Sequence, residues 1–157
     1  MDTEKKLAVL SKIAEKLNGE NVTWAVGASL LLYFKGKTDH FNDIDLMVME
    51  EDIPKLKRVF LSMGALLPSE PNDQYRTRCF LEFEIEDVEV DVMAGLILVN
   101  NHKEYDCSLR KEEIKEWVTV HSQKVPLHSL ERWKRYYELM GRKEKAEMIS
   151  KESAAKI

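Results

Sequence analysis

The stretch NDIDLMV, residues 42–48, combines the pattern of a strand with two closely spaced acids. Ile44, Leu46 and Val48 alternate along it, as expected of a strand that buries one face. Residues two apart in a strand share a face, so Asp43 and Asp45 point together to the opposite side. Their α-carbons should lie roughly 6–7 Å apart. The stretch therefore predicts a buried strand whose other face begins with two carboxylates.

Two carboxylates at this spacing can reach one Mg²⁺ or share a pair of ions. Without a cation, their mutual repulsion raises the pKa of one of them and costs stability. The alternative is a solvated strand edge with its charges in water, because an isolated D-x-D pattern is short and common.

A third acid, Asp91, lies between two valines in VEVDVMAG, residues 88–95, on the polar face of another predicted strand. If that strand lies beside the first, three carboxylates converge and offer hard oxygen ligands for Mg²⁺, with positions left for a triphosphate. Neighbouring glutamates show the same alternation, so an ordinary acidic outer face is the alternative for Asp91.

Upstream, WAVGAS at residues 24–29 is typical of a short strand, a small-residue turn and the start of a helix. Small residues there let backbone N–H groups and the Ser29 hydroxyl approach a phosphate at the positive end of a helix. Gly27, Ala28 and Ser29 are therefore candidate phosphate-binding residues. A tight turn that needs small residues only for packing is the alternative.

The rest of the chain interleaves helix and strand patterns. A first helix is predicted from a cap at Asp2 or Thr3 to a stop at Asn18-Gly19. Further helices are predicted over residues 29–34, 53–63, 130–140 and 142–151, strands over 24–27, 43–49, 117–121 and 125–127, a hairpin over 79–92, and a loop over 68–74. Residues 96–99 should continue the sheet or cover it, and the tail from residue 152 should fray. This pattern predicts an α+β fold with a mixed central β-sheet and helices packed on it. We expect a single domain over residues 1–157, with the C-terminal helices from about residue 129 packing on the sheet.

Charge and composition exclude several classes of function. The net charge is −4, from 24 basic and 28 acidic residues, which gives no argument for nucleic acid as a partner. Cys79 and Cys107 lack the paired spacing of a zinc site and suit a reduced compartment. The N-terminal segment is too charged for a signal peptide, and no apolar run approaches the roughly 20 residues of a membrane span. We expect a cytoplasmic protein without a membrane partner.

Other polar and aromatic residues carry weaker signals. The histidines show no metal spacing and are expected in loops or on the surface: His40, His102, His121 and His128. The tryptophans are expected to be core or half-buried: Trp24, Trp117 and Trp133. Lys134 could neutralise phosphate charge or be a solvated helix lysine, and Glu89, on the same face as Asp91, could be a base or a surface acid.

In this order, the small-residue turn, Asp43-Ile44-Asp45 and Asp91 resemble the nucleotidyltransferase superfamily, whose fold is shared with polymerase beta. The C-terminal stretch from Trp117, with its Val-Pro and Gly-Arg-Lys, is similar to the ending of small stand-alone members. Size and layout look closest to minimal members and to the lincosamide and aminoglycoside nucleotidyltransferases.

The resemblance implies an Mg²⁺-dependent enzyme, with one ion or two, that transfers a nucleoside monophosphate from a nucleoside triphosphate to a hydroxyl of a small molecule or a protein. Asp43, Asp45 and Asp91 would be its metal ligands and catalytic residues. The small-residue turn, residues 27–29, would bind the nucleotide.

Two departures from the family pattern keep a second hypothesis open. Ala28 replaces the family glycine, and the loop before Asp43 offers Lys37 and His40 in place of an arginine. The alternative is a catalytically impaired member that binds a nucleotide or a partner protein, as in a toxin–antitoxin pair, or a second copy of itself.

Overall fold

The computed structural model describes residues 2–68 and 77–151, so most of the predicted loop over 68–74 and the whole tail from residue 152 lie outside the described residues. Within them the helices are α1 (Thr3–Gly19), α2 (Ala28–Phe34), α3 (Ile53–Leu61), α4 (Leu130–Leu139) and α5 (Lys143–Ser150). Short 3₁₀ turns occupy Glu50–Asp52 and Lys111–Glu113.

The strands of the described residues form one large sheet and one small ribbon. They are β1 (Trp24–Val26), β2 (Ile44–Val48), β3 (Ala65–Leu67), β4 (Cys79–Ile85), β5 (Val88–Ala94), β6 (Ile97–Asn100), β7 (Lys103–Asp106), β8 (Glu116–Val120) and β9 (Gln123–Leu127). Seven of these described strands pair in the order β3-β4-β5-β2-β1-β9-β8. The pairs β2–β5 and β1–β9 are parallel and the others antiparallel. The predicted α+β fold with a mixed sheet is confirmed.

The first helix shows how local sequence sets an element. The side chain of Asp2 accepts a hydrogen bond from the backbone N–H of Glu4 at 3.2 Å and caps α1, which satisfies one of the unpaired donors of a helix start. Leu10, Ile13 and Leu17, at three- and four-residue steps, are fully buried. Burial of this apolar stripe, more than helix propensity, stabilises α1.

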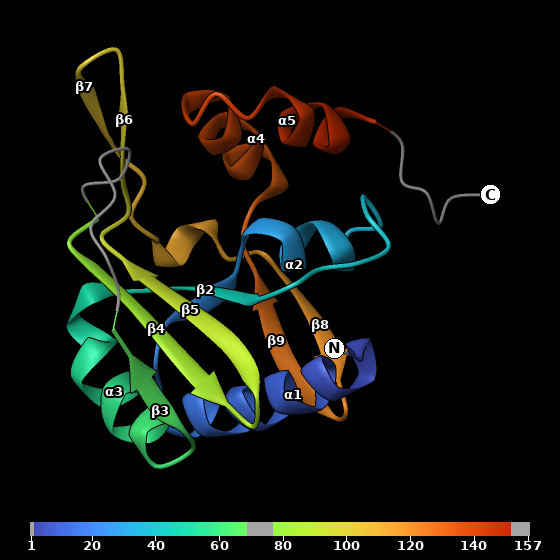
Figure 1. Cartoon of the computed structure of the whole chain (residues 1–157), viewed down its shortest axis with the longest axis vertical. Coiled ribbons are helices and arrows are strands. Elements are labelled where there is room, and N and C mark those ends of the chain that lie inside the picture. Colours follow the sequence, from blue (N-terminus) through green and yellow to red (C-terminus); the bar gives the residue numbers. More distant parts are fainter. Residues whose placement is uncertain (1, 69–76, 152–157) are drawn as a thin grey trace.

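The helices lie on both sides of the sheet. Figure 1 shows α1 and α3 on one side, and α2, α4 and α5 on the other. Ile44, Leu46, Val90 and Val92 of the central strands are fully buried. Because side chains alternate across a strand, the acids between these residues point to the side of α2, α4 and α5.

The predicted hairpin over residues 79–92 is confirmed as β4 and β5. Glu86 and Asp87 join them with φ of +50° and +68°, the conformation of the tight turn that matches the twist of paired strands. Residues 96–99 do not continue the large sheet, because β6 pairs with β7 as a separate two-stranded ribbon, although Leu96 and Leu98 are buried in the core.

One expectation about burial was wrong. Trp24 and Trp133 are buried as predicted, but Trp117 on the edge strand β8 is 55% exposed. His128 lies in the loop between β9 and α4, within the expectation of a loop or surface position, but it is buried there, with only 2% of it exposed. No helix among the described residues has both the length and the apolar character needed to cross a membrane.

Candidate nucleotide and metal site

The sheet places the acids of three neighbouring strands side by side. In the parallel pair β2–β5, Asp45 lies directly opposite Asp91. In the antiparallel pair β4–β5, Glu82 lies opposite Asp91 and Glu84 opposite Glu89. Residues opposite each other in paired strands share a face. The polar faces of β2, β5 and β4 therefore form one continuous acidic surface.

Three carboxylates of this surface come especially close together. One oxygen each of Asp43, Glu89 and Asp91 lies within 4.8 Å of the others. Oxygen ligands of Mg²⁺ lie about 2.1 Å from the ion, so small adjustments would let these three share one. The structure thus brings together the predicted Asp43 and Asp91 and adds Glu89. Asp45 lies outside this closest group, but it lines one cavity together with Asp43 and Asp91.

Burial and the crowding of acids raise the pKa values of several of these carboxyl groups. Burial, and then the charges of Asp91, Asp43 and Glu89, raises the pKa of Asp45 well above its ordinary value. Burial, followed by Glu89, Asp43 and Glu82, raises the pKa of Asp91 to about 7. The pKa of Glu89 is also raised, chiefly by burial and by Asp43. These carboxyl groups are therefore costly to ionise without a compensating cation.

One carboxylate oxygen of Asp91 also lacks a hydrogen-bond partner among the described residues. This atom, Oδ1, is buried. Buried polar oxygens in proteins almost always have a partner, and an unpartnered carboxylate oxygen among other acids suits a hard divalent cation. The residues present therefore fit the predicted metal, and their roles as its ligands remain predictions.

The turn that precedes α2 faces these acids. The backbone N–H of Gly27 donates to the carbonyl oxygen of Asp45 at 3.0 Å, which ties the turn to β2. A Cβ at Gly27 would lie 2.6 Å from the Trp133 ring, so only glycine fits there. Ala28 has φ of +52°, a left-handed backbone that favours glycine. Ala28 and Ser29 both line the cavity above the acids.

This cavity has a volume of about 800 Å³ and walls of three kinds. Acids form one wall, with Asp43, Asp45, Glu82 and Asp91. The start of α2 forms a second, and the C-terminal helices close the third with Trp133, Tyr137, Met140, Arg142 and Lys145. The volume is in the range of small-molecule and cofactor sites.

Several solved structures have a similar fold, whereas the sequence matches no protein-family model and no curated protein. A protein from Thermotoga maritima, itself provisionally assigned as a nucleotidyltransferase, superposes with a TM-score of 0.76 at 28% identity, over 96% of this chain and 93% of that one.

The chain has a nucleotidyltransferase-like fold.

Two antibiotic-related structures share this nucleotidyltransferase-like fold at lower identity. The ANT(2'')-Ia protein, in complex with adenylyl-2''-tobramycin, has a TM-score of 0.63 at 16% identity, over 92% of this chain and 87% of that one. The lincosamide antibiotic adenylyltransferase LnuA, bound to lincomycin, has a TM-score of 0.61 at 14% identity, over 94% of this chain and 96% of that one. The resemblance derived from the sequence is confirmed, and the Thermotoga neighbour agrees with the predicted enzyme class.

The basic residues of the nucleotidyltransferase-like cavity were missed by the sequence reasoning. Arg142 and Lys145 line it, whereas Lys134, the lysine singled out from the sequence, does not. The two were missed because nothing in the pattern of α5 marks which of its charged residues turns inward. Only the packing of that helix decides it.

A polar network that includes the buried His128 lies beside Trp133. Nε2 of His128 is 3.0 Å from Glu113, which also accepts from the backbone N–H of Arg110 at 2.9 Å and pairs with Arg132 at 3.3 Å. Burial lowers the pKa of His128, against the opposing effect of Glu113. Rings of Trp133 and Tyr136 pack on the imidazole. The network joins the Lys111–Glu113 turn to the end of β9 and supports the helix that closes the cavity.

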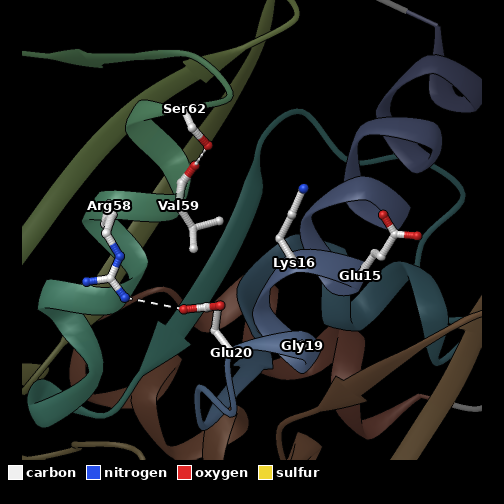
Figure 2. Close-up of a pocket in the computed structure, with 7 residues that line it drawn as sticks. All are labelled: Glu15, Lys16, Gly19, Glu20, Arg58, Val59 and Ser62. Atoms are coloured by element: carbon white, nitrogen blue, oxygen red, sulfur yellow. Dashed lines mark hydrogen bonds and ion pairs between the residues drawn. The ribbon is translucent and has the colours of Figure 1, made fainter.

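A second hollow lies between α1 and α3, on the opposite side of the sheet. Figure 2 shows its lining, in which Arg58 reaches across to Glu20 at 3.3 Å. Glu15, Lys16 and Ser62 complete its polar lining. Its charges are mixed and its acids do not converge, so we assign no chemistry to it.

Proposed function

We propose that the protein is an Mg²⁺-dependent nucleotidyltransferase that moves a nucleoside monophosphate from a nucleoside triphosphate to a hydroxyl acceptor. The observation that carries this proposal is the convergence of Asp43, Glu89 and Asp91, with an unpartnered Asp91 oxygen. Asp43 and Asp91 line one cavity together with Ala28 and Ser29 of the turn. We take residues 1–157 as one catalytic domain acting in the cytoplasm.

Each group of residues has a distinct role in this proposal. Asp43, Asp45 and Asp91 would hold one Mg²⁺ or two, and the ion would offset the negative charge of the triphosphate and of the leaving group. Ser29 and the backbone N–H groups of the turn at Gly27 and Ala28 would bind the phosphates.

The reaction exchanges a phosphoanhydride bond of the triphosphate for a phosphate ester bond to the acceptor. The acceptor oxygen forms a bond to the α-phosphorus, the bond from that phosphorus to the bridging oxygen breaks, and pyrophosphate leaves. The hydroxyl proton needs an acceptor, and the carboxylate of Asp91 would help to deprotonate or orient the acceptor hydroxyl.

A second function is favoured by one observation. The methyl group of Ala28 stands at the turn where a phosphate would approach, and its left-handed φ of +52° gives the site a strained backbone. This suits a catalytically impaired protein that keeps the fold to bind a nucleotide, a partner protein of the toxin–antitoxin kind or a second copy of itself.

Calorimetric titration with Mg²⁺ and each nucleoside triphosphate tests the proposal. We expect one triphosphate to bind in the presence of Mg²⁺, and we expect Asp43→Asn combined with Asp45→Asn to abolish that binding. The matched control is Glu112→Gln with Glu131→Gln, two exposed acids outside the cavity, which should bind as the wild type does.

The catalytic and impaired proteins are then separated by pyrophosphate release over a panel of hydroxyl acceptors. Release that depends on Asp43 and Asp45 supports the enzyme. Triphosphate binding without release for any acceptor supports the binding module. A wild-type protein that binds no triphosphate with Mg²⁺ would contradict the enzyme proposal.

A further inference from the structure

The loop before Asp43 does not bring positive charge to the cavity. The ammonium group of Lys37 donates to the backbone carbonyl of Lys151, and His40 pairs with Asp39 at 3.0 Å with 75% of its side chain exposed. Neither basic residue of this loop lines the cavity. A triphosphate carries several negative charges, so a site for it needs cations from elsewhere.

Within the described residues, the cations that line the cavity are Arg142 and Lys145 at the start of α5. Arg142 is already engaged, by Glu144 at 3.7 Å and by the face of the Tyr137 ring at 5.6 Å. Lys145 is half-buried, and its Nζ lies 3.5 Å from the hydroxyl oxygen of Ser29. This distance is at the long end for a hydrogen bond, so the ammonium group lies beside Ser29 without being firmly bound to it.

Lys145 also lies close enough to act on the acidic surface. It lines the same cavity as Asp45 and Asp91. The ammonium group therefore lies between the phosphate-side turn and the carboxylates. A cation bound by the acids would weaken the attraction between Lys145 and Asp45 and leave the ammonium group available to an anion.

Packing fixes the position of Lys145. Ala146 and Ile149 of α5 are buried in the core, which sets the rotation of the helix and directs Lys145 toward the cavity. Gly141, with φ of +77°, makes the turn between α4 and α5, a conformation that favours glycine. Both features come from the C-terminal helices, far along the chain from the acids and from the turn at Ser29.

We propose that Lys145 binds the β- and γ-phosphates of the nucleoside triphosphate together with Ser29, an inference that rests on the proposed function. The C-terminal helix α5 thereby supplies the phosphate-binding cation that the loop over residues 37–42 lacks. Lysine suits this role because its three N–H donors on a flexible stem can follow a phosphate chain.

Nucleotide affinity in the full-length protein tests this inference. Lys145→Ala and Lys145→Gln are each titrated with ATP, ADP and AMP in the presence of Mg²⁺, with another triphosphate series if the wild type prefers one. Loss of a charge-assisted hydrogen bond should weaken triphosphate binding by about 10- to 100-fold. Affinity for the monophosphate should change less than about twofold, because AMP lacks the β- and γ-phosphates.

Two further variants sharpen the result. Lys143→Ala removes an exposed lysine from the same helix, outside the cavity, and should bind ATP as the wild type does. Lys145→Arg, which keeps the charge, should bind ATP more tightly than Lys145→Ala. Using both Ala and Gln at position 145 guards against a variant that fails to fold, which circular dichroism would reveal.

The outcomes are distinct. Wild-type affinity for ATP in a folded Lys145 variant overturns the inference and leaves the proposed function standing. An equal loss of affinity for ATP and AMP also overturns it, because it indicates a general structural role. Absence of triphosphate binding in the wild-type protein overturns the proposed function and, with it, this inference.

Discussion

At the scale of single residues, the turn between β1 and α2 contrasts two neighbouring positions. Gly27 has an ordinary extended backbone, with φ of −130° and ψ of −171°, and needs glycine because the Trp133 ring leaves no room for a Cβ. Ala28 has φ of +52° and would be relieved by glycine, yet carries a methyl group. The backbone at this turn is therefore strained at Ala28. At Gly27 the absence of a Cβ avoids a steric clash with Trp133.

Ala28→Gly should stabilise the protein, because glycine adopts a left-handed φ without the steric penalty that other residues meet. We expect a gain of about 0.5–1 kcal/mol in the free energy of unfolding, measured by urea denaturation. Ala8→Gly, in the regular helix α1, should change stability in the opposite direction by about 1 kcal/mol. If both substitutions destabilise alike, Ala28 is not strained.

At the scale of elements, the parallel pairing of β2 with β5 creates the site. Each strand alone presents acids on one face, but their register sets Asp45 against Asp91, and β4 adds Glu82. Like charges directly opposite each other in a sheet are destabilising. The buried apolar faces of the same strands compensate, which lets the acidic surface persist.

The folded protein should lose stability as pH rises from about 4 to about 7 on account of Asp91. The pKa of this carboxyl is raised from 3.8 to about 7, so the folded state binds more protons than the unfolded state in that window. Stability therefore falls with rising pH there, and the loss is complete above the folded pKa.

The comparison that isolates this effect is wild type against Asp91→Asn in metal-free buffer, by thermal or urea unfolding between pH 5 and pH 8. The two should be most alike at low pH, where Asp91 is protonated. The Asn variant should become the more stable of the two as pH rises. If the difference in stability between the two proteins stays constant across this pH range, the pKa of Asp91 is not raised.

At the scale of the whole molecule, cation binding at the acids should be linked to global unfolding. The unfolded chain does not hold Asp43, Glu89 and Asp91 together, so a cation that binds them favours the folded state. At a concentration about 100-fold above its Kd, Mg²⁺ should stabilise the fold by about 2.7 kcal/mol, which corresponds to a rise in Tm of about 5–10 °C.

Scanning calorimetry with and without MgCl₂ measures this shift, with NaCl at matched ionic strength as the control for screening. The effect should be larger at pH 8 than at pH 6, because metal binding needs deprotonated carboxylates. Asp43→Asn with Asp45→Asn should remove the shift while leaving the metal-free protein at least as stable, since it removes repelling charges. An unchanged shift in that double variant would place the cation elsewhere.

The sequence by itself determined the main elements, because their signals are local. The apolar stripe of α1, the alternation in β4 and β5 and the Glu86–Asp87 turn each act within a few residues, and each is found where the pattern predicts it. The candidate acids were also identified from local spacing, together with the resemblance to nucleotidyltransferases.

Tertiary structure alone decided which further charged residues join the predicted acids. Glu89 joins the acids because β2 and β5 pair in a particular register, and Lys145 reaches the cavity because the packing of α5 sets its rotation. The burial of His128 depends in the same way on contacts from distant segments. Hydrophobic periodicity indicates which face of an element is buried. It does not indicate which polar side chains from separate elements come together when those faces are covered.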